Sequence, residues 1–213
     1  MHRHEHVSRV TGKALLLTLL PLSVQLVFWL ATGSLSVLSD TLHGLGHAFS
    51  LSLVLLAQKI ALQSHNREES FEHEYHLIEV GVSAANGVLL FVFGSYLLTE
   101  ALGRLDNPPA ISASIVFAGV VSLFFNLAVL RTLHTEREHF NIRVEVAHAV
   151  SDAGSSLGVI LAGVLIHFTG EAIFDPVVSI GIASVILLWS LVLIFRAGLH
   201  YLRTRRKTIK HTL

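Results

Sequence analysis

The stretch ISASIVFAGVVSLFFNLAVLRTL, residues 111–133, decides the fold class of this chain. It is strongly apolar, and Arg131 is its single charged residue. A helix needs about 20 mainly apolar residues to cross a bilayer, whereas a barrel strand needs only about 10. The stretch is therefore predicted to be a membrane-spanning helix.

Runs of the same kind lie on both sides of it. The sequence predicts six spanning helices, at residues 14–31, 37–62, 77–102, 111–133, 144–168 and 174–202. The composition agrees, since 52% of the residues are hydrophobic, 14% are charged and the mean hydropathy is +0.64. Soluble domains are less apolar and more charged than this. We expect an all-α membrane protein with six transmembrane helices.

The composition also excludes several classes of function. Lys plus Arg and Asp plus Glu each number 15, so no basic excess is available to bind nucleic acid. Cysteine is absent, which excludes disulfides and thiolate metal sites. A soft-metal site must therefore use histidine, and the chain has 14 histidines.

The Lys and Arg residues predict the orientation, because cytoplasmic loops retain them. They lie before the first span, after the second and fourth, and after the last, and only Arg104 lies on the other side. We expect both termini in the cytoplasm and a location in a bacterial inner (plasma) membrane. The expected division is a flexible, histidine-containing cytoplasmic leader (1–13), a six-helix domain (14–203) and a short basic tail (204–213), with no soluble C-terminal domain.

Two predicted spans carry ionisable residues, whose default explanation inside a membrane is function. The second span contains Asp40, His43 and His47, in LSDTLHGLGHAFS. The fifth span contains Glu145, His148 and Asp152, in VEVAHAVSDAGSS. Residues at i and i+4 share a helical face. A rise of about 1.5 Å per residue puts four of these residues near the midplane. In that estimate His43 is level with Asp152, and His47 is closer to His148.

Three imidazoles and one carboxylate, from His43, His47, His148 and Asp152, suit Zn²⁺, which prefers four tetrahedral ligands. Cd²⁺, Co²⁺ and Ni²⁺ also accept imidazole, whereas Mg²⁺ and Ca²⁺ prefer oxygen. Protons compete for the same ligands, so the chemistry is that of a metal/proton exchanger. Asp40 is read as a pathway acid, a partner of His43 or a helix cap, and Glu145 as facing the cytoplasmic mouth.

These residues resemble the motifs of the cation diffusion facilitator family. SLSVLSDTLHGLGH resembles its second helix, NIRVEVAHAVSDAGSSLGVILAG its fifth and FDPVVSIGIA its sixth. The resemblance implies export of Zn²⁺ or a related divalent ion in exchange for protons, with His43, His47, His148 and Asp152 at the transport positions. His47 stands where the family usually has Asp. Most members continue after the sixth helix into a cytoplasmic domain that helps them dimerise. Because no such domain is expected here, we expect a homodimer formed through the transmembrane helices.

Other readings stay open from the sequence. A membrane histidine is often an interhelical hydrogen-bond partner, and paired histidines also hold haem in membrane electron carriers. An intramembrane zinc hydrolase needs an open zinc position, but the HExxH signature is missing. His65, His73 and His76, in the segment between the second and third spans, are candidates for an accessory cytoplasmic metal site.

Overall fold

The computed structural model describes residues 2–63, 68–109, 111, 114–134 and 140–212, and this part of the chain is helical. Its helices are α1 (His2–Thr32), α2 (Leu35–Gln63), α3 (Glu68–Gly103), α4 (Ile115–His134), α5 (Phe140–Thr169) and α6 (Phe174–Thr212). Each of the six predicted spans falls within one of these helices, apart from a few residues at the start of the fourth. The predicted all-α fold is therefore confirmed.

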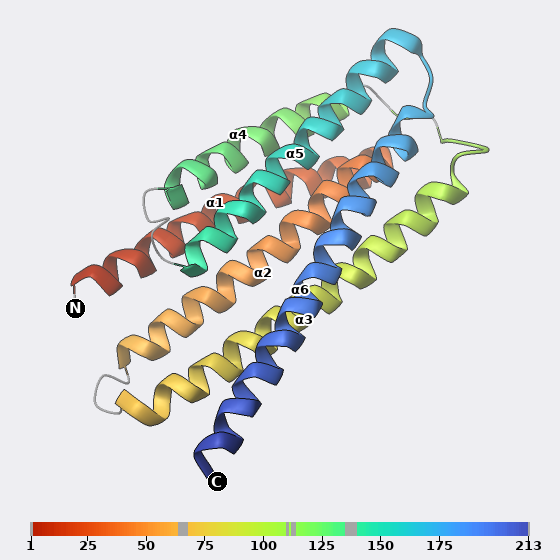
Figure 1. Cartoon of the computed structure of the whole chain (residues 1–213). Coiled ribbons are helices and arrows are strands. Elements are labelled where there is room, and N and C mark those ends of the chain that lie inside the picture. The colour runs from red at the N-terminus through yellow and green to blue at the C-terminus, as the bar shows by residue number, and fades with distance from the viewer. Residues whose placement is uncertain (1, 64–67, 110, 112–113, 135–139, 213) are drawn as a thin grey trace.

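Consecutive helices run in opposite directions and form one elongated bundle (Figure 1). Both chain ends lie at the same end of this bundle, which we call the termini end. The most extensive contacts join α3 with α6 and α4 with α5, while α2 lies at the centre and packs against each of the other five helices. Residues on α2 are therefore the ones best placed to meet residues from several helices.

The bundle has the surface of a membrane protein. Large apolar side chains such as Leu30, Phe124 and Phe195 are two-thirds exposed or more. Five helices contain segments that are long and apolar enough to cross a membrane, at Ser8–Thr32, Ala84–Gly103, Ile115–His134, Glu145–Thr169 and Phe174–Leu199. Helix α2, with 29 residues, is not among them within the described residues. It packs against each of the other helices.

The first and last helices extend beyond the predicted spans. Helix α1 begins at His2, so residues 2–13, which were expected to form a flexible leader, continue the first helix. The leader has no proline and no glycine before Gly12, so nothing in its sequence stops the helix. Helix α6 likewise continues through the basic tail to Thr212.

Asp175, in the first turn of α6, joins the ends of α2 and α6. It is fully buried. Its Oδ2 accepts the backbone N–H of Leu35 at 2.7 Å, and its Oδ1 accepts the N–H of Ser36 at 3.1 Å and the hydroxyls of Ser34 and Ser36 at 2.5 and 2.6 Å. Free N–H groups at a helix start need such an acceptor. The start of α2 is therefore fixed to α6 at the end opposite the termini.

Small residues bring particular helices together. In the structure a Cβ on Gly46 would meet Leu90 of α3, one on Gly158 would meet Val178 of α6, and one on Gly154 would meet nothing within 4 Å. These three glycines therefore do not bring α2 against α5. Close approach occurs instead at α4 and α5, where a Cβ on Gly119 would lie 3.1 Å from a backbone nitrogen.

Candidate metal site between helices α2 and α5

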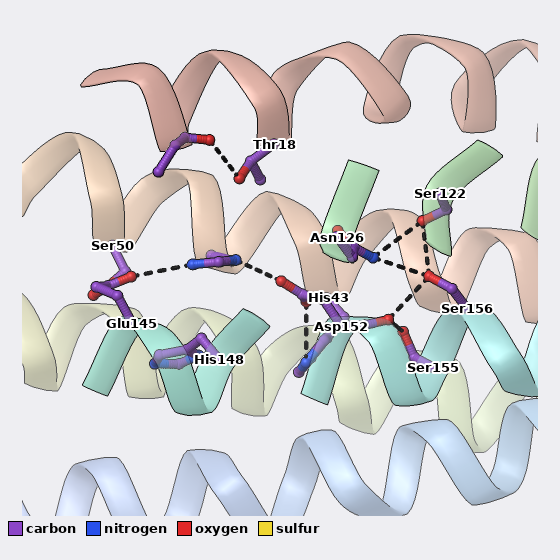
Figure 2. Close-up of polar contacts among 12 residues, drawn as sticks. Thr18, His43, Ser50, Ser122, Asn126, Glu145, His148, Asp152, Ser155 and Ser156 are labelled. Carbon is purple, nitrogen blue, oxygen red and sulfur yellow. Dashed lines mark hydrogen bonds and ion pairs between the residues drawn. The ribbon is translucent and has the colours of Figure 1, made fainter. Parts of the chain in front are cut away.

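Helices α2 and α5 turn their histidine clusters toward each other at the centre of the bundle (Figure 2). The spacing of four residues puts His43 and His47 on one face of α2, and His148 and Asp152 on one face of α5. All four side chains are buried, with 2% of their surface exposed. The apolar contacts of the surrounding helices thus enclose a group of ionisable side chains.

Asp152 of α5 contacts two histidines of α2. Its Oδ2 lies 2.5 Å from Nδ1 of His47, and its Oδ1 lies 3.3 Å from Nε2 of His43. This agrees with the depth argument, which placed His43 level with Asp152. The structure therefore brings a carboxylate from one helix against two imidazoles from the other.

His148 lies against His47, as the depth argument also suggested. Their rings stack with centroids 5.6 Å apart and planes 18° apart. On its other side, Trp189 of α6 packs edge-on at 5.4 Å and donates its indole N–H to Nε2 of His148 at 3.5 Å. Helix α6 therefore orients the one histidine of α5 in the group.

Glu145 belongs to the same group of side chains. Its Oε2 lies 3.2 Å from Nε2 of His47, and its Oε1 accepts the hydroxyl of Ser50 at 2.7 Å. The side chain is 2% exposed. Glu145 is therefore buried between α2 and α5, and the expectation that it faces the cytoplasmic mouth stays a prediction.

Several polar atoms of this group lack hydrogen bonds although they are buried. Both nitrogens of His43, Nε2 of His47, Oε2 of Glu145 and Oδ1 of Asp152 have no hydrogen-bond partner. Buried polar atoms normally have one, so such atoms suit a further ligand. Among the described residues, no three His, Asp or Glu side chains are already arranged around one point as a metal cage. Binding of an ion requires these side chains to turn.

Asp40 lies one turn along α2 from His43 and belongs to a separate polar network. Its carboxylate accepts hydrogen bonds from Gln25 of α1 and from Ser155 and Ser156 of α5. Ser156 in turn contacts Ser122 of α4 at 2.8 Å. Asp40 is not a helix cap, because it lies in the second turn of α2 and is buried. It links four helices beside the histidine group.

A cavity of about 520 Å³ lies between α5 and α6 and extends to His43. Small and aliphatic residues line it, among them Gly154, Gly158 and Gly181, and Leu161 and Val185 at its wall are more than half exposed. The cavity therefore joins the histidine group to the outside of the helix pair.

Other candidates lie beyond what the structure describes. His65 is outside the described residues, and the side chains of His73 and His76 on α3 are also outside them. The accessory metal site therefore stays a prediction. Conversely, the sequence did not single out Ser50 or Trp189. Ser50 lies three residues after His47 and so shares its face, which was a usable signal. Nothing in the sequence indicated that Trp189, on α6, would reach His148.

The sequence of the chain was compared with known proteins. The family described as the cation efflux transmembrane domain matches residues 13–202. A cadmium, cobalt and zinc/H⁺-K⁺ antiporter of Bacillus velezensis is 28% identical over 207 residues, which cover 93% of this chain and 63% of the relative. The metal cation efflux system protein CzcD of Cupriavidus metallidurans is 32% identical over 84% of this chain and 58% of its own. The zinc transporter ZitB of Escherichia coli is 28% identical over 77% and 53%.

The chain thus spans somewhat more than half the length of these curated relatives. The family match extends from α1 into α6 and includes both histidine clusters. The motifs in α2, α5 and α6 that resemble cation diffusion facilitators lie within it. The chain belongs to the cation efflux family, as the resemblance predicted.

Proposed function

We propose that this integral membrane protein exports a divalent metal cation, Zn²⁺ in the first place, from the cytosol in exchange for protons. The observation that supports it most directly is the buried meeting of two imidazoles of α2 with a carboxylate of α5, beside a third imidazole. Imidazole nitrogen with carboxylate oxygen is the donor set of zinc sites without cysteine. His43, His47, His148 and Asp152 are the proposed ligands.

The relatives support transport over the other readings. Their names describe a metal antiporter, a metal cation efflux protein and a zinc transporter. Neither a haem carrier nor a zinc hydrolase fits these names. The protein is accordingly a transporter and not an enzyme, with Zn²⁺ as its first substrate and Cd²⁺, Co²⁺ or Ni²⁺ as the nearest competitors.

Proton exchange follows from the ligands themselves. An imidazole must be unprotonated and a carboxylate ionised to bind metal, so protons reaching the site expel the ion. H⁺ is the proposed counter-ion, and the names of the Bacillus relatives add K⁺ beside it. The cavity between α5 and α6 extends to His43, and it is proposed to be the path by which the metal ion leaves the site.

The proposed orientation puts the termini end in the cytoplasm, in keeping with the Lys and Arg distribution. Movement of α2 and α5 relative to each other then opens the site to one side at a time, which is alternating access. Asp40 is proposed to keep these two helices aligned through Ser155 and Ser156. The proposed unit is a homodimer joined by transmembrane helices of the two copies.

The test is zinc uptake into proteoliposomes that hold a zinc-sensitive dye and an acidic interior. We expect uptake by the native chain that depends on the pH gradient and is lost in Asp152→Ala. Glu171→Ala, an exposed acid outside the site, is the matched control and should transport normally. If folded native protein takes up none of the four candidate metals, the proposed function is wrong.

A further inference from the structure

We propose that the metal occupies two successive positions in the membrane, and that Glu145 is a ligand of the first. This inference rests on the proposed function. The two positions are marked by two pairs of facing side chains: the Glu145–His47 pair and the His43–Asp152 pair. The first lies nearer the termini end, because α5 runs away from that end and Glu145 precedes Asp152 (Figure 1).

His47 is the residue that the two positions share. One ring nitrogen, Nδ1, faces Asp152, and the other, Nε2, faces Glu145. The two nitrogens of an imidazole point in different directions, so one ion cannot bind both. A metal beside Nε2 therefore meets Glu145, and a metal beside Nδ1 meets Asp152. Figure 2 shows Glu145 and Asp152 apart along α5, as this requires.

The distances fit a metal at each pair. Two ligand atoms bound to one tetrahedral zinc ion at about 2.0–2.1 Å lie about 3.3–3.4 Å from each other. The observed separations are 3.2 Å from Oε2 of Glu145 to Nε2 of His47 and 3.3 Å from Oδ1 of Asp152 to Nε2 of His43. None of these four atoms has a hydrogen bond. The two facing atoms of each pair are therefore spaced as two zinc ligands and have no hydrogen-bond partner.

The surroundings complete each pair differently. His148 lies one turn after Glu145 on α5 and stacks on His47, so it joins the first position. Because Trp189 donates to Nε2 of His148, its Nδ1 is the nitrogen left for metal. The second position has His43, Asp152 and Nδ1 of His47, and only His43 of these residues lines the cavity toward α6.

Charge gives a second reason for Glu145. At the first position the neutral imidazoles of His47 and His148 alone would leave a divalent ion with both of its positive charges, which is costly inside a membrane. Glu145 supplies a negative charge in contact with His47. The Glu145 carboxylate is thus close to the ion when the ion enters the first position from water. The metal then passes to Asp152 as His47 exchanges one nitrogen for the other.

Two kinds of variant separate the two positions. Asp152→Asn and His43→Gln remove ligands of the second position only, and Glu145→Gln removes a ligand of the first. We expect Asp152→Asn to bind one zinc ion in calorimetry without transporting it, and Asp152→Asn with Glu145→Gln to bind none. In transport, Glu145→Gln should raise the half-saturating zinc concentration at least about tenfold. Glu171→Gln is the control and should behave as native.

The result that overturns the inference is loss of all zinc binding in folded Asp152→Asn and in folded His43→Gln, which would mean a single position. Native uptake by Glu145→Gln at every zinc concentration would overturn it as well. Either result leaves the proposed export intact as long as the native chain transports zinc. Absence of transport by the native chain, with zinc still bound by folded Asp152→Asn and not by the double variant, would instead remove the proposed function alone.

Discussion

The contact of Asp175 with the start of α2 makes a prediction about stability that can be worked out from its hydrogen bonds. Replacing Asp175 by Ala removes the acceptor of two backbone N–H groups and two serine hydroxyls. Loss of a helix cap costs about 1 kcal/mol for each N–H group left unpaired, and each hydroxyl adds about 1 kcal/mol. Because such losses are not additive, the expected destabilisation is about 2–4 kcal/mol.

The measurement is unfolding of the purified protein in mixed micelles by increasing detergent denaturant, followed by tryptophan fluorescence. Asp175→Asn keeps one acceptor oxygen but places an amide N–H₂ group opposite a donor. Its free energy of unfolding should therefore fall by about half as much as that of Asp175→Ala. Glu171→Ala changes an exposed acid four residues away and should not shift the midpoint. A loss below about 1 kcal/mol for Asp175→Ala would refute the assignment of Asp175 as a structural cap.

Two further predictions concern packing and the site. Gly163→Ala should destabilise the bundle by about 1–3 kcal/mol, because the new Cβ would lie 2.5 Å from Val116, whereas Gly154→Ala has open space and should be nearly neutral in the same unfolding assay. Co²⁺ titration should quench the fluorescence of Trp189, whose ring lies 5.4 Å from that of His148; quenching that persists in Trp189→Phe would show that the metal binds elsewhere.

The arrangement of the helices was largely predictable from the sequence. Long apolar runs and charged breaks are set by the bilayer thickness, so their number and type follow from composition. The helix ends were less predictable. In the leader the same residues suit a solvated segment or an extension of α1, and only the structure distinguishes them. Helix α2 has no candidate membrane span within the described residues, yet it packs against each of the other five helices.

The candidate site was predictable where it depended on helical spacing alone. His43, His47, His148 and Asp152 follow from an i, i+4 pattern on two antiparallel helices. Which residues surround them depends on the rotation of neighbouring helices, and a single sequence does not fix that rotation. Asp40 is the example: the sequence suggested a cap or a partner of His43, whereas α1 and α5 supply its partners.

The Asp175 contact also determines how a movement of α2 is shared along its length. Because its first turn is hydrogen-bonded to α6, a tilt of α2 pivots about that turn. At about 1.5 Å per residue, a tilt of about 5° displaces His47 by about 1.6 Å and the far end at Gln63 by about 3.7 Å. The displacement at His47 is therefore short, about the length of a metal–ligand bond. The displacement at the Gln63 end of α2 is larger than a water molecule and is enough to admit water.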